Sequence, residues 1–404
     1  MSPWLHVIGI GADGLDGLSS AARRLVAGAD VLVGGARHLA LVEVAPQQEC
    51  LQWPSPFSAL TDELRARSDR TVCVLASGDP LVFGVGNVLS AHFDRTEMTV
   101  VPAPSAFALA RAKLGWNADG LDYLTLHGRP LAQLQTFVQP GARLLILTTD
   151  DSGPRAIAAA LTARGFGPSE LTVMEQLGAE GERVRACRAD AFAFDDIATL
   201  NTVAVRCVAS AGADVLTCLP GLPDDAFRHD GQLTKRIVRA ATVSALGPLP
   251  GALLWDVGAG CGSVAIEWLR AVRGTRAIAV ERHPDRLQMM SDNAEALGTP
   301  QLRIAAGSAP AALHDLPQPD AIFVGGAASD ASVLDVCWDA LPAGGRLVAN
   351  AVTIQGETEL ARRYDRLGGE LQRIAVASAR PVGRFAAFDP AMSVTQLVVT
   401  KPYS

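Results

Sequence analysis

The chain of 404 residues has few aromatic side chains, no closely spaced cysteine pair and no long apolar run. Aromatic residues make up 5% and charged residues 19% of the chain, whereas hydrophobic residues make up 49%, so its cores must be largely aliphatic. The seven cysteines are scattered without a Cys-x-x-Cys pair, which argues against a zinc knuckle, a bound metal and a disulfide framework. No stretch approaches the roughly 20 continuous apolar residues that span a bilayer.

An excess of positive charge is also missing, because the formal net charge is −7. A protein that binds nucleic acid normally needs a basic face to replace the phosphate counterions. The balance therefore opposes a nucleic-acid partner, although a local basic pocket for a small polyanion stays open. The chain also enters a strand at once, without a basic leader or a cleavage site, so we expect a cytoplasmic protein with no membrane partner.

The most informative segment is an apolar strand that runs directly into a Gly-x-Gly-x-Gly turn. Glycines at Gly258, Gly260 and Gly262 remove the Cβ atoms that would keep the backbone away from a ligand. Glu281 ends the next strand, where its carboxylate can accept hydrogen bonds from ribose hydroxyls. A dinucleotide fingerprint would need a glycine at the position of Ser263, so the spacing favours S-adenosylmethionine instead.

The length of the chain predicts two or three domains, and we take two. The segment 216–228 is rich in proline, glycine and acidic residues and interrupts the apolar pattern, so we place the boundary there. We therefore predict a first domain over residues 1–215, a linker over 216–224 and a second domain over 225–404.

In the second domain, helical and strand patterns alternate. That order predicts an α/β doubly wound, Rossmann-like sheet of seven strands with an antiparallel final hairpin, and a ligand crevice at the carboxyl ends of its strands. The expected strands cover residues 253–257, 276–281, 302–305, 321–324, 346–351, 371–377 and 396–400.

Three further segments of the second domain follow expected strands and so face the same crevice. The segment 307–309 is placed to flank an adenine, 325–326 leaves space for a bulky planar group, and 350–353 presents two polar side chains. The pair 325–326 could equally be ordinary turn chemistry, whereas the other two segments favour a role at the ligand. Cys261, inside the glycine turn, has no base at hand, so we interpret it as a small space-filling side chain. The residues that we place around ligands on these grounds are Ser308, Ala309, Gly325, Gly326 and Asn350.

In the first domain, the expected strands cover residues 4–10, 31–33, 71–76, 98–101, 121–126, 143–149 and 201–209. Four loops follow such strands, at residues 9–14, 77–80, 102–106 and 127–130. None has the dinucleotide spacing, so the domain is a different kind of α/β fold. Asp79 can cap its own turn or contact a ligand, and both interpretations stay open. His127 lies beside Arg129 at a strand end, and we include both among the candidate substrate residues.

These segments make the two halves resemble known methyltransferases. The first half resembles the tetrapyrrole methylases, class III methyltransferases that act on corrin precursors, and the second resembles the class I methyltransferases that also decarboxylate such precursors. The first resemblance rests on Val7-Ile8-Gly9-Ile10-Gly11, Ala76-Ser77-Gly78-Asp79-Pro80, Pro104-Ser105-Ala106-Phe107 and Leu126-His127-Gly128-Arg129. The second rests on Thr234-Lys235, Asp256-Val257-Gly258-Ala259-Gly260-Cys261-Gly262-Ser263, Phe323-Val324-Gly325-Gly326 and Asn350-Ala351-Val352-Thr353.

The resemblance implies a bifunctional enzyme of cobalamin biosynthesis that uses one S-adenosylmethionine in each domain. It implies methylation of a precorrin-6 type tetrapyrrole at carbons 5 and 15 and decarboxylation of the ring C acetate at carbon 12. The second domain would methylate carbon 15 and decarboxylate, and the first would methylate carbon 5. The implied cofactor residues are Thr234, Gly258, Ala259, Gly260, Cys261, Gly262, Glu281 and Ala309 in the second domain, and Gly9, Gly78, Asp79, Ser105 and Ala106 in the first.

Three departures from the family pattern affect the second cofactor site. No proline precedes Thr234, Glu281 replaces the commoner aspartate, and Ser308 stands where an acidic residue is usual. The adenine contact is therefore less secure than the ribose contact.

For this chemistry we expect basic side chains to anchor the carboxylates of the substrate, because guanidinium binds carboxylate as a fork. The candidates are Lys235, Arg236, Arg380 and Arg384, with ordinary solvated charge the better interpretation of Arg236. We also expect a homo-oligomer. Two alternatives stay open: an RNA methyltransferase whose first half is a passive binding module, and one active methyltransferase with a regulatory first half.

Overall fold

The computed structural model describes residues 3–403, which form two compact units. The N-terminal unit consists of the residues up to Leu131 together with Pro140–Asp214, and the C-terminal unit of Ala132–Gln139 together with the residues from Val215 onward. Among the described residues, no helix is both long enough and apolar enough to cross a membrane.

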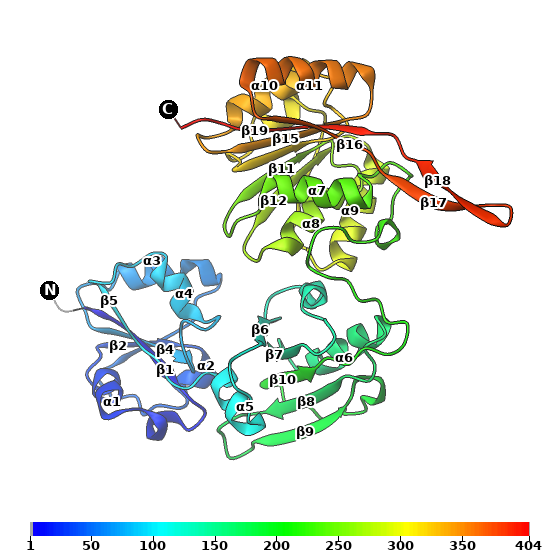
Figure 1. Cartoon of the computed structure of the whole chain (residues 1–404). Helices are drawn as coiled ribbons and strands as arrows, with labels where there is room; N and C mark the ends of the chain where they lie inside the picture. The colour runs from blue at the N-terminus through cyan, green and yellow to red at the C-terminus, as the bar shows by residue number, and fades with distance from the viewer. Residues whose placement is uncertain (1–2, 404) are drawn as a thin grey trace. The chain divides into compact units, whose positions relative to one another are not determined.

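The N-terminal unit begins with a five-stranded sheet in the order β3-β2-β4-β1-β5, and every pairing in it is parallel (Figure 1). Helices cover both faces, so successive residues of one strand enter different cores: Leu5 and Val7 pack in one, Ile8 and Ile10 in the other. The elements are β1 (Leu5–Ile10), α1 (Ser20–Ala27), β2 (Val31–Gly34), α2 (Ala36–Leu39), β3 (Glu49–Gln52), α3 (Leu60–Arg65), β4 (Val72–Ser77), α4 (Val85–Ser90) and β5 (Met98–Val101).

A second five-stranded sheet completes the N-terminal unit, in the order β6-β7-β10-β8-β9. Only β6 and β7 pair in parallel, and the other strands are antiparallel. The elements are α5 (Ala106–Leu114), β6 (Leu121–Thr125), β7 (Arg143–Leu147), α6 (Gly153–Ala163), β8 (Glu170–Glu175), β9 (Arg183–Arg188) and β10 (Asn201–Arg206). Strands β3, β8 and β9 were not among those expected from the sequence.

The C-terminal unit contains the predicted seven-stranded sheet, in the order β13-β12-β11-β14-β15-β19-β16 (Figure 1). All pairings are parallel except those of β19, which is antiparallel to both neighbours. The doubly wound fold with a final antiparallel pair is thereby confirmed. The elements are α7 (Arg236–Leu246), β11 (Leu253–Val257), α8 (Ser263–Ala271), β12 (Arg276–Glu281), α9 (Pro284–Ala296), β13 (Arg303–Ala306), β14 (Ala321–Val324), α10 (Ala331–Ala340), β15 (Arg346–Ala351), α11 (Ile354–Leu367), β16 (Glu370–Ile374) and β19 (Val394–Thr400).

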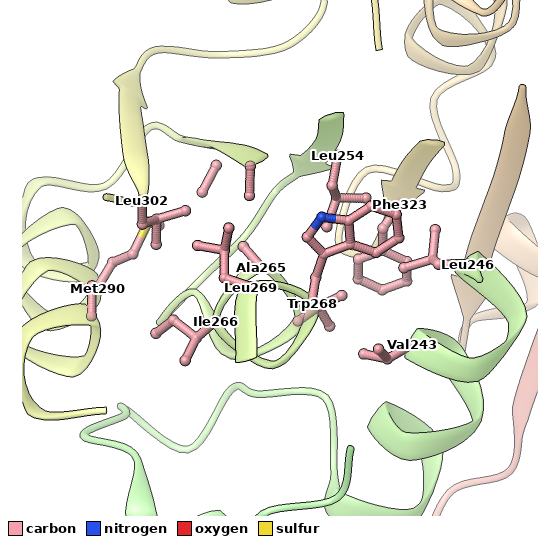
Figure 2. Packing of buried hydrophobic residues seen from close by; sticks show 14 of the residues in the cluster. Val243, Leu246, Leu254, Ala265, Ile266, Trp268, Leu269, Met290, Leu302 and Phe323 are labelled. Atoms are coloured by element: carbon pink, nitrogen blue, oxygen red, sulfur yellow. The ribbon is translucent and has the colours of Figure 1, made fainter. Parts of the chain in front are cut away.

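Helix α8 is the centre of one core of this unit. Figure 2 shows the indole of Trp268 beside Leu254 and Phe323 of the sheet, with Met290 of α9 in the same apolar cluster. Trp268 is fully buried, and its ring nitrogen donates to the carbonyl of Arg276 (3.0 Å). This packing fixes α8 and the turn before it against the sheet.

Two features of the C-terminal unit were not expected. A hairpin of β17 (Ala377–Val382) and β18 (Phe385–Pro390) leaves the sheet between β16 and β19, with all twelve strand residues exposed (Figure 1). The short 3-10 segment Leu131–Thr136 follows β6 in the chain, yet Ala132–Gln139 folds with the C-terminal unit. There Cys218 donates to the carbonyl of Thr136 (3.2 Å), and Gln139 donates to the carbonyl of Leu216 (2.7 Å).

Candidate active sites

The glycine turn of the C-terminal unit forms an open backbone cradle. Gly258, Gly260 and Gly262 have φ values of +72°, +58° and +80°, which favour glycine. A Cβ at Gly258 or Gly260 would approach no atom closer than 3.5 Å, so the space before them is open, whereas a Cβ at Gly262 would lie 2.6 Å from Met290 Cγ. Two glycines thus let a ligand approach the backbone, and the third lets α8 and α9 pack closely. The cradle fits a cofactor held at a helix N-terminus.

Glu281, at the end of β12, is fixed beside this cradle. One carboxylate oxygen accepts from the Gly260 amide (2.9 Å), and the other accepts from the amides of Arg282 (2.8 Å) and His283 (3.0 Å). The side chain is 5% exposed. Three backbone donors thus orient the carboxylate, and the turn and the acid meet as the sequence predicted. That Glu281 holds a ribose stays a prediction.

Asp256, which begins the motif of the glycine turn in the sequence, is a further member of this site. It lies under the turn and is 1% exposed. Its Oδ2 accepts from the Ala265 amide (3.0 Å), whereas Oδ1 has no partner among the described residues. Burial raises the pKa of Asp256 to about 7, the bond from Ala265 acts against this, and the charge of Glu281 adds to it. A buried carboxylate with a free oxygen is costly, which is typical of functional sites.

The other predicted loops of the C-terminal unit meet around the same turn. The Gly307 amide donates to the carbonyl of Glu281 (2.9 Å), which places Ser308 and Ala309 next to the end of β12. A Cβ at Gly258 would have the Gly326 nitrogen as its nearest atom, at 3.5 Å, so Gly325 and Gly326 lie across the cradle from the turn. The structure therefore brings together three of the predicted segments.

The segment before α7 borders the cradle from another direction. A Cβ at Gly260 would lie 3.5 Å from the carbonyl oxygen of Gln232. Thr234, two residues further on, offers its carbonyl to Arg239 (2.6 Å), and Lys235 lies 3.9 Å from the carboxylate of Asp224. Thr234 is thereby held near the turn.

Asn350 is used inside the fold rather than in the crevice. It is 8% exposed, its Nδ2 donates to Thr242 (2.9 Å), and its Oδ1 accepts from Gln396 (2.9 Å). Thr353, expected to face the crevice beside it, accepts from the Gly356 amide and caps α11. The two polar side chains are thus engaged in packing β15 and in starting a helix.

Arg380 and Arg384 lie on the exposed hairpin, not beside the glycine turn. Arg380 pairs with Asp389 (2.9 Å), and the guanidinium of Arg384 lies 5.0 Å from the ring centre of Phe385. The hairpin leaves β16 on the side of the sheet where the parallel strands end, but β14, β15 and β19 separate this edge from the turn. A cavity of about 660 Å³ runs along β16 and β19 from Arg346 and Thr400 to Ile374 and Gln396, and no residue of the glycine turn lines it.

In the N-terminal unit, Gly78 is the point at which three of the predicted loops meet. Its amide donates to the carbonyl of Ile10 (3.0 Å), and its carbonyl accepts from the Ala103 amide (3.1 Å). Gly78 has a φ of +56°, and a Cβ at Gly9 would collide with its carbonyl oxygen. The ends of β1, β4 and β5 therefore converge backbone against backbone, and only glycine fits at both positions.

Two predicted polar residues beside Gly78 have local structural partners. Asp79 accepts from the Leu81 amide (2.9 Å), and Ser105 accepts from the Ala108 amide (3.2 Å) and caps α5 directly before Ala106. Both the capping interpretation and the ligand interpretation of Asp79 remain compatible with this geometry, because one carboxylate oxygen has further acceptor capacity.

A cavity of about 440 Å³ adjoins these loops. Its wall includes an aromatic row in which Phe107 packs edge-on against Phe83 and Tyr123. The guanidinium of Arg129 lies 5.5 Å from the ring centre of Phe83, so the fourth predicted loop contacts a residue that lines the cavity. The backbone amide of His127 donates to Thr125 (3.2 Å). The lining residues are Leu81, Val82, Phe83, Asn87, Ser105, Phe107, Ala108, Arg111 and Tyr123.

Family models match both halves of the chain. The model described as "Tetrapyrrole (Corrin/Porphyrin) Methylases" matches residues 4–193, and the model described as "Precorrin methyltransferase domain" matches residues 225–401.

Named relatives match either nearly the whole chain or a little under half of it. A "Precorrin-6Y C(5,15)-methyltransferase [decarboxylating]" of Sinorhizobium sp is 47% identical over 401 residues, which are 99% of this chain and 97% of that protein. A "Cobalt-precorrin-7 C(5)-methyltransferase" of Salmonella typhimurium is 34% identical over 45% of this chain and 88% of its own. A protein of Pyrobaculum calidifontis, named as a probable cobalt-precorrin-6B C(15)-methyltransferase (decarboxylating), is 32% identical over 44% of this chain and 95% of its own. The chain therefore belongs to the family of precorrin-6Y C(5,15)-methyltransferases (decarboxylating).

Proposed function

We propose that this chain methylates a precorrin-6 type tetrapyrrole at carbons 5 and 15 and decarboxylates its ring C acetate, at carbon 12, in cobalamin biosynthesis. The C-terminal unit methylates carbon 15 and decarboxylates, and the N-terminal unit methylates carbon 5. The observation that carries the proposal is the pair of separate backbone cradles, one around Gly258 and one around Gly78. The partial relatives support the division, since one name has the carbon 5 reaction alone and another the carbon 15 reaction with decarboxylation.

Each unit binds one S-adenosylmethionine, two for each chain. This cofactor, when bound, supplies an electrophilic methyl group on a sulfonium. In the C-terminal unit, the turn from Gly258 to Gly262 and the loop at Ala309 hold it closely, and the oriented carboxylate of Glu281 receives its ribose hydroxyls. In the N-terminal unit, the loops around Gly9, Gly78 and Ser105 hold it.

The protein needs no strong base for the methylations. The bridging carbons of a reduced tetrapyrrole are enamine-like nucleophiles. The residues of each unit would position such a carbon beside the methyl donor and exclude water, and the demethylated cofactor would leave as a neutral thioether. The glycine pair 325–326 leaves room for the planar macrocycle over the C-terminal cradle.

For the decarboxylation, the bond between the side-chain carbon and its carboxylate breaks, carbon dioxide leaves, and the conjugated macrocycle accepts the electron pair. The side-chain carbon then takes up a proton from solvent and becomes a methyl group. The role of the chain is to hold the remaining carboxylates, and Lys235, Arg380 and Arg384 are the candidate anchors. The two arginines lie on the β17–β18 hairpin, so they act only if the hairpin closes over the crevice of its own chain or of a neighbouring copy.

We also propose the domain limits 1–215 and 225–404, with a linker over 216–224.

We propose in addition a homo-oligomeric state. Large apolar side chains at the hairpin support association, because Phe385, Phe388 and Met392 are 68%, 77% and 77% exposed. Light scattering after gel filtration should give a multiple of the 42.2 kDa chain mass. Serine at both phenylalanine positions should reduce it, and a monomeric wild type would contradict the association.

The experiment that tests the proposed function is a product mass spectrum. The full chain is incubated with S-adenosylmethionine and a metal-free precorrin-6 type substrate, and in parallel with its cobalt form. Two methyl groups gained and one carbon dioxide lost is the expected result for at least one substrate. No mass change with either substrate would refute the reaction.

A further inference from the structure

Arg37, His38 and Ser77 form a polar cluster in the N-terminal unit that the proposed reaction does not use. Arg37 Nη2 donates to Ser77 Oγ (2.8 Å), Ser77 Oγ lies 2.8 Å from His38 Nε2, and Arg37 Nη2 lies 3.2 Å from the same nitrogen. Ser77 is the last residue of β4, and Arg37 and His38 lie on the short helix that follows β2. Strands β2 and β4 are parallel neighbours, so the cluster spans their carboxyl ends.

The contact with Arg37 favours one tautomer of the imidazole. Arginine only donates, so the 3.2 Å contact is a hydrogen bond in the tautomer whose Nε2 accepts and whose ring proton is on Nδ1. Nδ1 is buried without a partner and faces Gly35, where a Cβ would lie 3.4 Å from it. Burial, and then the charge of Arg37, lower the pKa of His38 to about 4, so the ring is neutral near pH 7. Ser77 Oγ accepts from Arg37 and lies beside the same imidazole nitrogen.

The guanidinium of Arg37 is thus held by two neutral acceptors. Among residues 3–403, no carboxylate forms an ion pair with Arg37, and its side chain is exposed. An oriented guanidinium without an anion is a ready site for a carboxylate, which it can bind through two parallel hydrogen bonds. The residue after Ser77 is Gly78, where the three loops of the N-terminal cradle converge.

We propose that Arg37 binds a carboxylate side chain of the tetrapyrrole in the N-terminal unit, with His38 and Ser77 as positioning residues that aim its guanidinium. The inference rests on the proposed function, which supplies a substrate with several carboxylates. The cofactor also carries one carboxylate. We assign the site to the macrocycle because the cluster lies over β2 and β4, to one side of the point where the loops after β1, β4 and β5 meet.

The test uses the full chain with Arg37→Ala, a precorrin-6 type substrate and S-adenosylmethionine, with products resolved by mass. Loss of carbon dioxide marks the reaction of the C-terminal unit, so each chain contains its own control. The KM of the tetrapyrrole for methylation of carbon 5 should rise roughly ten- to hundredfold, since a charged hydrogen-bond partner is lost. The Kd of the cofactor, the rate of decarboxylation and kcat should each change less than about threefold.

Matched variants separate positioning from general stability. Arg37→Lys keeps the charge without the fork and should have an intermediate KM. His38→Gln keeps an acceptor and should stay near wild type, whereas His38→Leu removes it and should raise KM about three- to tenfold. Arg95→Ala removes an exposed arginine just before β5, at the opposite end of the sheet, and should change nothing.

The outcomes distinguish this inference from the proposed function. A wild type that yields no methylated product refutes the proposed function. An active wild type together with an unchanged tetrapyrrole KM in Arg37→Ala refutes the inference alone. A tenfold weaker cofactor affinity in Arg37→Ala also overturns it, since the cluster would then bind the cofactor carboxylate.

Discussion

The two units contain two differently built backbone surfaces, which we propose bind the same kind of ligand. In the C-terminal unit, one continuous turn supplies the surface, and buried carboxylates at Asp256 and Glu281 surround it. In the N-terminal unit, three separate loops supply it by crowding against Gly78, and the nearby charge is the cationic cluster at Arg37. The first surface is local in sequence and the second is assembled from distant segments. Changes confined to one unit should therefore affect one reaction and spare the other.

The largest expected effect is that of Gly9→Ala. The added Cβ would collide with the Gly78 carbonyl and lie 2.5 Å from the Ala103 nitrogen, so the N-terminal loops must move apart. Methylation of carbon 5 should fall about a hundredfold or more, because displacements near 1 Å have effects of this size. Product mass spectra should show decarboxylation unchanged. Gly115→Ala, at an open position in the same unit, is the control, and an equal loss there would make the effect one of general destabilisation of the unit.

Gly258→Ala is the corresponding change in the C-terminal unit and should give a smaller loss. No atom blocks the new Cβ, so the fold tolerates it with about 1–2 kcal/mol of backbone strain, but the methyl group enters the cradle. We expect about a ten- to hundredfold loss of carbon 15 methylation and unchanged carbon 5 methylation. Gly251→Ala carries comparable strain (φ +83°) before β11 and should keep full activity. Equal losses in the two variants would mean that the cradle does not bind the cofactor.

Asp256→Asn tests the carboxylates that distinguish the C-terminal site. Burial raises the pKa of Asp256 to about 7, so the folded chain binds more protons than the unfolded chain, and the contribution of this carboxyl to stability falls from about pH 4 to pH 7. The variant lacks this loss, so its stability relative to wild type should rise by up to about 4 kcal/mol over that range. Hydrogen exchange of α8 at several pH values measures this.

Asp330 is the control carboxyl, because its contribution to stability changes with pH in the opposite direction. Hydrogen bonds from Ser332 lower its pKa, so the stability that Asp330 contributes grows as the pH rises from its folded pKa to its unfolded pKa. Asp330→Asn should therefore lose stability relative to wild type across that acidic window. If the stability differences of the Asp256 and Asp330 variants from wild type changed with pH in the same direction, Asp256 would be ionised in the folded chain.

Arg384→Ala should have the smallest effect. If the hairpin carries a substrate anchor, the KM of the tetrapyrrole for the decarboxylating reaction should rise about three- to tenfold while cofactor affinity stays constant. Arg303→Ala, at the start of β13, removes an exposed arginine from the other end of the sheet. An unchanged KM would remove Arg384 from the substrate site.

The sequence predicted the parts of the fold that depend on local pattern. The segment Leu253–Val257 is an apolar run, interrupted only by Asp256, that leads into a glycine turn, and the structure has β11 at those residues. Strand β9 was not predicted because its arginines make the segment appear polar. Arg183 and Arg185 both pair with the buried carboxylate of Glu175, and hydropathy does not register such compensation. The hairpin β17–β18 was not predicted because all its strand residues are exposed, so no alternation of buried and exposed residues indicates it.

The same limit applies to the sites. The glycine turn and Glu281 are recognisable because they belong to one strand–helix–strand unit. Asn350 was placed in the crevice, yet its partners Thr242 and Gln396 come from other parts of the chain. Ser77 meets the residues after β2 through a hydrogen bond to Arg37 that spans 40 positions. Polar side chains of this kind acquire their roles from tertiary contacts, which residue spacing does not reveal.

The most direct test of two independent cofactor sites is a count of bound S-adenosylmethionine by native mass spectrometry. We expect two molecules for each wild-type chain and one for each of the variants Gly9→Ala and Gly258→Ala. One molecule for each wild-type chain, lost entirely in one variant and retained in the other, would contradict the account and leave one half of the protein without a cofactor.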